Sequence, residues 1–281
     1  MKHFIVTRFN LKVEQWKTAK DGSLVLTEKW LEERFDLFEK YCFPSVINQK
    51  NKMFYWLIFF DIDTPDIFRK RIEKITRNYD NFKPLYIDGI KSLNNSFIQF
   101  IIENLDDKDD FIITSRLDND DSIHQDFVYT IQNLAIKKHE TVIDLRKGYQ
   151  IDISNDIYEC RNYSNSFNPF ISLVESSDKF NTVLSRMHRD WKNSNSIIVY
   201  ENLPLWIEIV HKKNKLNHTQ SNIPLIKKIK LRDFGIIKKL KNRNYIFIVR
   251  NNLILKLKKS LKKSTKLKKF KRKIKTFYNP S

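Results

Sequence analysis

Clustered carboxylates follow an apolar segment in the first half of the chain. Residues 110–114 have the composition of a buried strand, and Asp118, Asp120 and Asp121 come shortly after them. A strand that stops in aspartates places oxygen ligands at the carboxyl edge of a sheet, where open α/β folds bind ligands. Oxygen ligands suit Mg²⁺ or Mn²⁺, ions that are held by one or two carboxylates plus the phosphates of a substrate. The alternative is an acidic loop before a helix, because Asp is frequent at turns.

The glycines exclude two common ways of binding a nucleotide. A Walker A loop and a Rossmann fingerprint both need clustered glycines, so that the backbone can approach a phosphate. The chain has four glycines, and each is isolated in the sequence: Gly22, Gly89, Gly148 and Gly235. A nucleotide would therefore be held through a metal ion and basic side chains.

The elements that must position the aspartates alternate between strands and helices. This pattern predicts an α/β fold with a mostly parallel sheet and helices on both faces. A capping-box pattern at Ser122 and Gln125 predicts the start of one of these helices. The expected strands are residues 3–9, 55–60, 85–87 and 110–114, and the expected helices are 28–42, a segment opening at 64–65, 91–104 and 122–136.

The second half of the chain is richer in short strands. Residues 141–145 and 149–153 flank Arg146, Lys147 and Gly148, a pattern typical of a hairpin. No linker separates the halves, so we expect one domain over residues 1–225, made of the alternating half (1–121) and the strand-rich half (122–225). Further strands are expected at residues 157–161, 170–174, 197–200 and 206–210.

The basic charge of the chain is concentrated near its end. Residues 226–275 carry 21 Lys and Arg and one acid, Asp233, whereas the rest of the chain carries 31 basic and 32 acidic residues. Within residues 252–277, apolar residues recur at helical spacing among the lysines, which predicts an amphipathic helix that is broken or adjusted near Ser264 and Thr265. Residues 226–281 are therefore expected to form a basic helical tail. Such a helix favours an anionic membrane surface. One alternative is a solvated tail. Another is a nucleic-acid clamp, but the neutral body and the lack of a binding motif disfavour nucleic-acid binding.

The remaining composition indicates a cytoplasmic protein. The two cysteines, Cys42 and Cys160, have no metal-ligand spacing and are expected to be buried thiols in a reducing compartment. We expect no cleaved signal peptide, because an apparent strand follows Met1 directly, and no apolar run long enough to span a membrane. The expected location is therefore the cytoplasm, at the inner face of the cell membrane.

Together these segments resemble a known family. A parallel sheet without a glycine-rich loop, ending in Asp118-Asn119-Asp120, looks like a GT-A-type glycosyltransferase, and more specifically like the bacterial rhamnosyltransferase family. The resemblance covers residues 1 to about 220 and leaves out the basic tail. It is carried by residues 4–10, Trp30-Leu31-x-x-Arg34, Phe38-Glu39-x-x-Cys42, Phe59-Phe60-Asp61-x-x-Thr64-Pro65, 115–121, Gly148-Tyr149 and Trp206-Ile207-x-x-Val210-His211-x-x-Asn214.

The resemblance implies a Mn²⁺ or Mg²⁺ ion that bridges the two phosphates of a nucleotide-sugar. It implies that Asp120 is a direct metal ligand, that Asp118 lies near the ribose or the metal, and that His211 supplies a late imidazole ligand. The implied substrate-binding residues are Arg8, Asp61, Arg116, Asp118, His188 and Lys212, with Asp61 at the base or ribose, His188 on the acceptor side and Lys213 as the alternative to Lys212.

An inverting transferase also needs a base that takes the proton of the acceptor hydroxyl. The resemblance places this base between the metal motif and the late histidine, where Glu175 and Asp190 are the two candidates. The expected function is metal-dependent transfer of a sugar, with rhamnose as the family's example, from a nucleotide-sugar to a glycan or lipid-linked glycan in polysaccharide or lipopolysaccharide biosynthesis. The alternative is a nucleic-acid-binding protein or metal-dependent nuclease that uses the acidic cluster and the basic tail.

Overall fold

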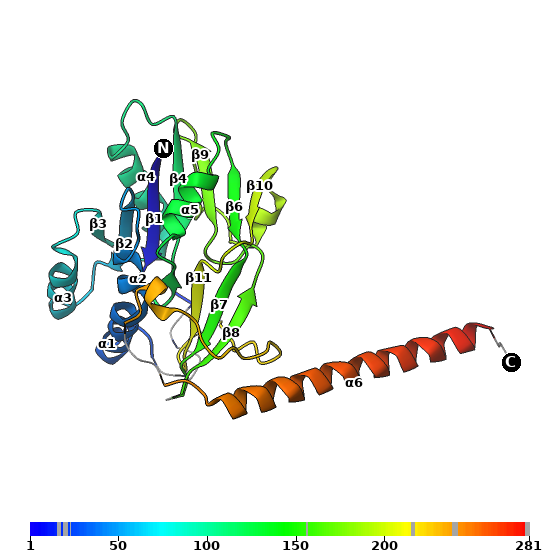
Figure 1. Cartoon of the computed structure of the whole chain (residues 1–281). Coiled ribbons are helices and arrows are strands. Elements are labelled where there is room, and N and C mark those ends of the chain that lie inside the picture. Colours follow the sequence, from blue (N-terminus) through cyan, green and yellow to red (C-terminus); the bar gives the residue numbers. More distant parts are fainter. Residues whose placement is uncertain are drawn as a thin grey trace.

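The computed structural model describes residues 1–15, 18, 22, 24–155, 157–214, 217–237 and 241–278, with the side chains of the last helix described up to residue 262. The chain forms a body with two sheets, and one long helix projects away from it (Figure 1). The expected α/β class is confirmed.

The larger sheet contains seven strands: β1 (Lys2–Arg8), β2 (Tyr55–Asp61), β3 (Phe82–Ile87), β4 (Phe111–Arg116), β6 (Thr141–Leu145), β9 (Ser172–Ser176) and β10 (Ser196–Tyr200). Their order is β10-β6-β9-β4-β1-β2-β3. Neighbours are parallel except that β9 runs antiparallel to both β4 and β6. The carboxyl ends of β1, β2 and β4 therefore meet at one edge. These strands are buried on both faces, which explains their continuous apolar sequences.

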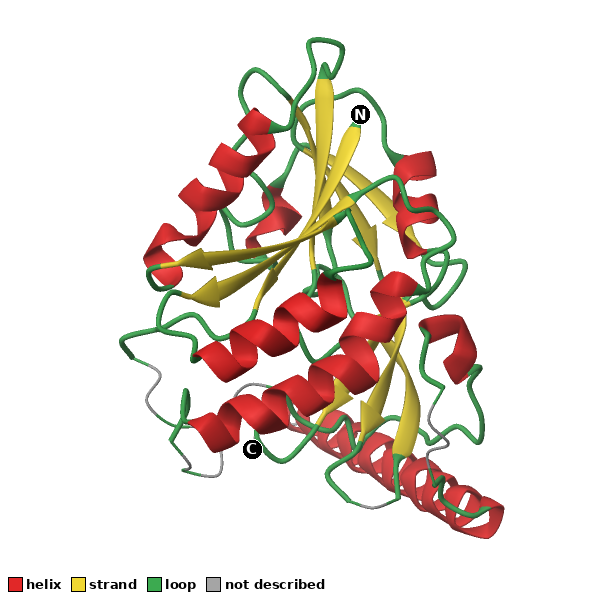
Figure 2. Cartoon of the chain, turned by 90° about the vertical axis from the view of Figure 1, so that its left-hand side faces the viewer, coloured by secondary structure: helices red, strands yellow, loops and turns green. Residues whose placement is uncertain are grey.

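Helices cover both faces of the larger sheet (Figure 2). One face packs against a nearly continuous helical segment and two further helices, and the other face packs against α4 and the segment around Trp191. The first group is α1 (Glu28–Leu37), the π-helical turn η1 (Phe38–Cys42), α2 (Phe43–Ile47), α3 (Asp66–Thr76) and α5 (Phe127–Leu134). The second face carries η2 (Ile90–Ser92), α4 (Leu93–Glu103) and η3 (Asp190–Asn193).

The smaller sheet is built from the second half of the chain. Its strands are β5 (Ser122–Ile123), β7 (Lys147–Asp152), β8 (Glu159–Ser164) and β11 (Trp206–Val210), in the order β5-β11-β7-β8. The predicted hairpin of residues 141–153 is wrong, because β6 and β7 belong to different sheets. Gly148 is not a turn residue: a Cβ there would lie 2.2 Å from the ring of Trp206.

Two predicted helix boundaries also differ from the structure. The helix expected from Ser122 begins only at Phe127, because Ser122 lies in β5 and donates a hydrogen bond to the carbonyl of Tyr41 at 2.9 Å instead of capping a helix. The expected helix 28–42 continues to Ile47 through η1, where the N–H of Phe43 bonds the carbonyl of Phe38. Pro44 lacks an N–H donor, and the wider turn precedes it.

The sequence predicted a helical tail over residues 226–281, but the structure is not helical throughout this segment. Residues 226–237, with the short helix η4 (Leu231–Phe234), pack on the smaller sheet and bury Ile229, Phe234 and Ile236. Only α6 (Tyr245–Tyr278) projects from the body. The apolar residues of 226–237 thus belong to the core. The helix predicted over residues 252–277 lies within α6, which begins earlier, at Tyr245, and continues through Ser264 and Thr265 without a break. Among the described residues, no helix combines the length and apolarity needed to cross a membrane.

Candidate active site

The turn that carries the aspartates is fixed to the end of β1. Leu117 donates its N–H to the carbonyl of Val6 at 3.0 Å, which extends the pairing of β4 with β1. The buried amide of Asn119 then donates to the carbonyls of Arg8 at 3.2 Å and Phe9 at 2.9 Å. The turn is therefore held rigidly at the carboxyl edge of the sheet, as the sequence predicted.

Asp120 is the centre of the site. Its Oδ2 accepts hydrogen bonds from Arg34 Nη1 at 2.8 Å, His211 Nε2 at 2.9 Å and Asn214 Nδ2 at 3.3 Å. Burial alone would raise the pKa of Asp120, but the Arg34 guanidinium and the bond from His211 outweigh it and hold that pKa well below its usual range. Asp120 is thus a buried carboxylate that stays ionised.

Asp118 is half-buried beside two arginines. Its Oδ1 lies 3.7 Å from Arg116 Nη2 and 3.9 Å from Arg8 Nε, beyond hydrogen-bond distance in both cases. The two guanidinium groups come from the ends of β1 and β4. Asp118, Arg8 and Arg116 are therefore together at the site, as expected, with an excess of positive charge.

Asp121 has a different place from its neighbours. Its Oδ1 accepts the N–H of Ile209 in β11 at 2.8 Å, and the side chain is 2% exposed. Burial raises the pKa of Asp121, and the charges of Asp120, Asp118 and Glu208 raise it further. Asp121 therefore connects the aspartate turn (residues 117–121) to the smaller sheet and does not face the site.

A cavity of about 190 Å³ opens beside Asp118 and Asp120. Basic and amide side chains line one part of it, and an aromatic and aliphatic part adjoins them. Lys213 lines this cavity and pairs with Glu33 of α1. Lys212, the residue expected to contact the diphosphate, is exposed; together with His211 it lines a neighbouring cavity, which shares Arg34 and Lys213 with this one. The cavity is lined by Arg8, Phe9, Asn10, Leu11, Val13, Thr18, Val25, Leu26, Trp30, Arg34, Ile90, Asp118, Asn119, Asp120, Lys213, Asn214 and Asn217.

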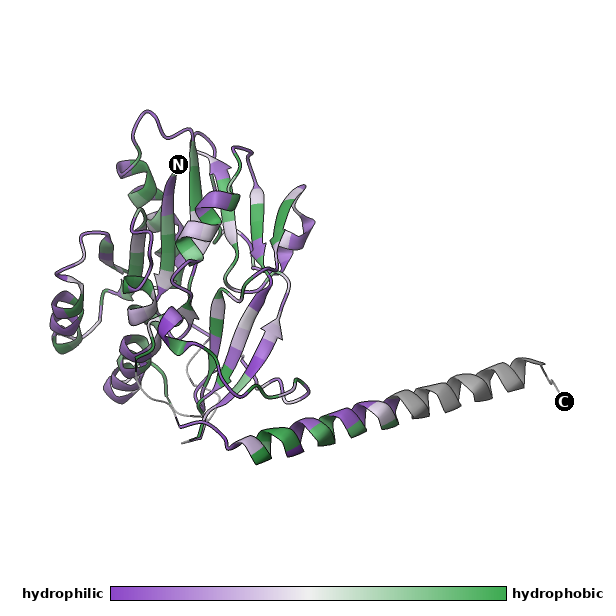
Figure 3. Ribbon diagram, viewed as in Figure 1, coloured by the Kyte–Doolittle hydropathy of each residue, from purple (hydrophilic) through white to green (hydrophobic). Residues whose placement is uncertain are grey.

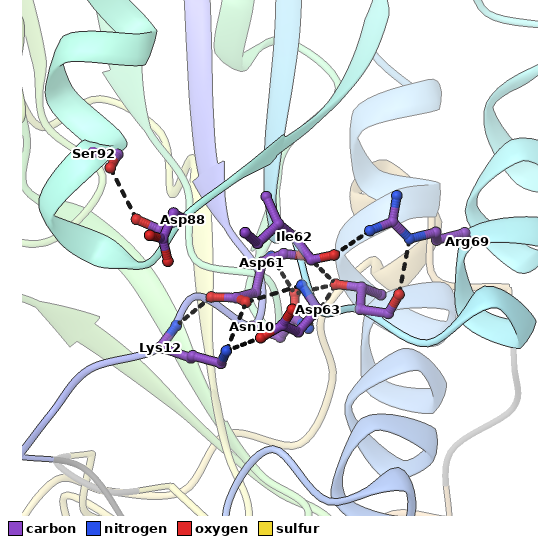
Figure 4. Close-up of polar contacts among 9 residues, drawn as sticks. Asn10, Lys12, Asp61, Ile62, Asp63, Arg69, Asp88 and Ser92 are labelled. Atoms are coloured by element: carbon purple, nitrogen blue, oxygen red, sulfur yellow. Dashed lines mark hydrogen bonds and ion pairs between the residues drawn. The ribbon is translucent and has the colours of Figure 1, made fainter.

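Asp61, expected at the base or ribose, organises two loops. Its Oδ2 accepts the N–H of Lys12 at 3.1 Å and its Oδ1 accepts that of Asp63 at 3.1 Å (Figure 4). Asn10 accepts the N–H of Asp61 at 3.2 Å and donates to Thr64 at 3.0 Å. The carboxylate is 2% exposed and is not among the residues that line the cavity. Asp61 therefore shapes the loop over the cavity from outside it.

The two expected base candidates lie away from the cavity. Glu175 pairs in register with Ile112, at the amino-terminal end of β4, and its carboxylate accepts the N–H groups of Asn181 at 2.9 Å and Thr182 at 3.0 Å. Asp190 is exposed at the start of η3. The structure therefore does not bring either carboxylate to the aspartate turn.

His188 lies nearer to the site than the base candidates do. Its Nδ1 is hydrogen-bonded to the carbonyl of Phe167. Burial lowers the pKa of His188, and the charges of Arg116 and Arg189 act in the same direction. His188 is thus half-buried, with the charge of Arg116 acting on it, and its expected role on the acceptor side stays a prediction.

The side chains at Asp120 fit a divalent cation held with the help of a substrate. Among the described residues, no three His, Cys, Asp or Glu side chains gather closely enough to hold an ion alone. Asp120 and His211 supply one carboxylate and one imidazole at 2.9 Å from each other. Mg²⁺ and related ions commonly take one or two protein ligands and complete their shell with substrate phosphates and water. The donor set suits an ion shared with a diphosphate.

Three residues at the site were not assigned from the sequence. Arg34 and Asn214 belong to the segments that carry the family resemblance, but their contact with Asp120 depends on the fold. Glu208 is the third, and its signal is a single acid within the apolar strand β11. The residue that follows it, Ile209, donates its N–H to Asp121, so Glu208 lies beside the aspartate turn.

The family follows from a comparison with family models. The model described as "Putative rhamnosyl transferase" matches residues 2–223. The chain belongs to this family. The match ends before α6, as the resemblance did. A comparison with curated proteins found no match.

Solved structures give more distant likenesses. S. aureus TarS 1–349 has a TM-score of 0.43 and 14% identity, over 74% of this chain and 60% of that chain. The same fragment in complex with UDP has a TM-score of 0.44 and 13% identity, over 75% and 61%. The inositol-1-phosphate CTP transferase from T. maritima has a TM-score of 0.34 and 15% identity, over 77% and 92%. The chain thus spans about 60% of the length of TarS 1–349.

Proposed function

We propose that the protein transfers a sugar, rhamnose being the one its family description names, from a nucleotide-sugar donor to a surface-glycan acceptor, with Mn²⁺ or Mg²⁺ as cofactor. The observation that carries this proposal is the contact of Asp120 with His211 at the carboxyl edge of the larger sheet, beside a cavity that also contains Asp118. Open α/β folds bind their ligands at this edge.

The cavity has a lining suited to each part of a nucleotide-sugar. Arg8 and Lys213 supply positive charge for a diphosphate, in the absence of a glycine-rich loop. Trp30 offers an aromatic surface for a base, and its ring also packs under Arg34 at 5.0 Å. Asp118 has an exposed edge and is placed to accept a hydrogen bond from a ribose or sugar hydroxyl.

Asp120 and His211 would hold the cation, with donor phosphates completing its shell. The bound ion neutralises the charge that develops on the leaving nucleoside diphosphate. Arg34 and Asn214 keep the Asp120 carboxylate ionised and oriented toward the cavity. Arg8 and Arg116 would stabilise the leaving diphosphate from the opposite side, since both stand next to Asp118.

A binding screen followed by a transfer assay tests this proposal. UDP-, GDP- and dTDP-sugars are added with and without MnCl₂, and the shift in melting temperature is recorded. We expect one nucleotide to raise the melting temperature only when Mn²⁺ is present. Asp120→Asn should abolish the shift, whereas Asp107→Asn, an exposed aspartate on the loop after α4, should retain it. No shift with any donor, or an unchanged shift in Asp120→Asn, contradicts the proposal.

We also propose that α6 attaches the enzyme to an anionic membrane, where a lipid-linked glycan would serve as acceptor. Ile248 is buried on the body, and Asn252 bonds the N–H of Leu225 at 2.8 Å and its carbonyl at 2.9 Å. These contacts fix the start of α6 to the body. Apolar and polar residues alternate along the described part of the helix (Figure 3). Its exposed apolar face is made of Ile246, Val249, Leu253, Leu257 and Leu261, with Lys256, Lys258, Lys259 and Lys262 beside it.

A further inference from the structure

Glu208 is a carboxylate on the polar side of the smaller sheet. The two isoleucines that flank it in β11, Ile207 and Ile209, point the other way into the core beneath residues 226–237. Glu208 is in register with Gln150 of β7, so the two side chains stand next to each other. It is only partly buried, whereas its neighbours in the strand are buried. An acid at such a position has no structural requirement to be there.

Hydrogen bonds orient one oxygen of Glu208 and leave the other available. Oε2 accepts a bond from Gln150 Nε2 at 3.1 Å. Gln150 is itself fixed, because its Nε2 also donates to the carbonyl of His218 at 3.1 Å and its Oε1 accepts the N–H of Gln220 at 2.7 Å. Within the described part of the chain, Oε1 accepts no hydrogen bond and is not among the buried polar atoms without a partner. Oε1 is therefore not completely buried and has no hydrogen-bond partner among the described residues.

Glu208 lies next to the aspartate turn, because the residue that follows it, Ile209, donates its N–H to Asp121 at 2.8 Å. Burial raises the pKa of Glu208 to about 7, the bond from Gln150 opposes this, and the charges of Asp120 and Asp118 add to it. Its own charge contributes to the raised pKa of Tyr163, on β8, after the burial of that phenol. The ionisable groups that interact electrostatically with Glu208 thus belong to the aspartate turn and to β8.

We propose that Glu208 is the catalytic base of the transfer reaction. The acceptor hydroxyl oxygen attacks the anomeric carbon of the donor and forms the new glycosidic bond. The bond from that carbon to the phosphate oxygen breaks, and its electron pair leaves with the nucleoside diphosphate. The hydroxyl proton passes to Oε1 of Glu208. A single displacement of this kind inverts the anomeric configuration. The assignment rests on the proposed function and adds the acceptor side to it.

Two properties suit Glu208 to this role. Its orientation by Gln150 is already in place before an acceptor arrives, which lowers the cost of aligning the base. A base works best when its pKa is close to the working pH, and the environment of Glu208 provides this. Glu175 lacks both a free oxygen and access to this edge, since its two oxygens accept backbone N–H groups.

The test is Glu208→Gln, which keeps the size of the side chain and an oxygen for Gln150 but removes the basic group. We expect kcat for transfer to fall by about 10²- to 10⁴-fold. The melting-temperature shift produced by the nucleotide with Mn²⁺ should equal that of the wild type, because the donor site is intact. Glu201→Gln, an exposed carboxylate just after β10, should keep both the activity and the shift.

A pH profile separates a base from a structural residue. In the wild type, log kcat/KM should rise with pH below about 7 and level off above it, and this rising limb should vanish in Glu208→Gln. Transfer in Glu208→Gln within a few-fold of the wild type, or retention of configuration, overturns the assignment. Loss of the nucleotide shift together with the activity overturns it too. If the wild type itself shows no nucleotide shift, it is the proposed function that fails.

Discussion

Asp120 shares a single carboxylate oxygen among Arg34, His211 and Asn214. A buried carboxylate is stable in its charged form only when opposite charge and hydrogen bonds compensate its lost hydration. The same contacts that compensate the buried charge therefore keep Asp120 ionised, as the proposed cation site requires. This dual role makes Arg34 the residue at which stability and function are most tightly connected.

Replacement of Arg34 by Met should destabilise the protein by about 3–5 kcal/mol at pH 7, because it leaves a buried carboxylate without its counter-charge. The folded-state pKa of Asp120 is lowered, so its contribution is present above the unfolded value of 3.8 and is lost as the pH falls below it. Urea denaturation at several pH values measures this. The difference in the free energy of unfolding between wild type and variant should narrow below about pH 4. If this difference does not change with pH, the role given to Arg34 is contradicted.

Glu175 should respond to mutation in the opposite way from Glu208. Its carboxylate holds the N–H groups of Asn181 and Thr182, and Thr182 has a left-handed backbone with φ of 71°. Glu175→Gln should therefore lower the free energy of unfolding by about 1–3 kcal/mol while kcat stays unchanged. Paired measurements of unfolding and of transfer rate check this. A large loss of kcat without loss of stability would return Glu175 to the list of base candidates.

The residue pattern placed the aspartate turn, whereas His211 was expected beside Asp120 only from the family resemblance, and Arg34 and Asn214 were not expected there. Asp118 and Asp120 could be placed at a strand end, because the apolar run before them marks a buried strand. The contact of Asp120 with His211 joins residues 91 positions apart, and it depends on the pairing of β11 with β5. No local pattern contains that pairing. Glu208 was missed for the same reason, since its neighbours in space belong to other strands.

At the level of elements, the parallel half of the fold was predictable and the second sheet was not. Long apolar runs separated by helices indicate parallel strands in any order. The change from β6 to β7 is different, because Arg146 alone separates two strands that enter different sheets. The ring of Trp206 lies where a side chain at position 148 would be, so long-range packing decides the break. Local sequence favoured a hairpin there.

Residues 226–237 belong to the body, and Gly235 provides a direct test of this. Its φ is +68°, and a Cβ there would lie 2.2 Å from the carbonyl oxygen of Pro44. Gly235→Ala should cost about 2–5 kcal/mol through backbone strain and this clash. Gly22→Ala is the matched control, with φ of +82° and nothing within 4 Å of a Cβ, and should cost about 1 kcal/mol. Equal urea midpoints for the two variants would argue against tight packing of this segment.

At the scale of the whole molecule, the excess of basic residues and the candidate active site lie in different parts of the chain. The body contains the cavity, and α6 extends from it with an apolar face and many lysines. A basic amphipathic helix lies in a membrane interface with its apolar face in the acyl boundary. Each basic residue near an anionic surface adds about 1 kcal/mol of attraction. Attachment through α6 would leave the body free to meet a glycan.

Leu253→Glu with Leu257→Glu should abolish binding to vesicles of phosphatidylglycerol and phosphatidylcholine, because it puts two acids on the apolar face. The control is Met53→Glu with Ile67→Glu, which changes two exposed apolar residues on the body by the same charge. Co-sedimentation measures the bound fraction, and a soluble acceptor measures activity. We expect the α6 variant to keep its activity on the soluble acceptor. Equal binding of both double variants would contradict the proposed role of α6.

The most direct test of the central claim is the position of manganese in a crystal grown with Mn²⁺ and the nucleoside diphosphate selected by the binding screen. The account predicts an anomalous peak at about 2.1 Å from a carboxylate oxygen of Asp120, with His211 and the diphosphate oxygens completing its shell. A nucleotide bound elsewhere, or bound in this cavity with manganese away from Asp120, would contradict the account.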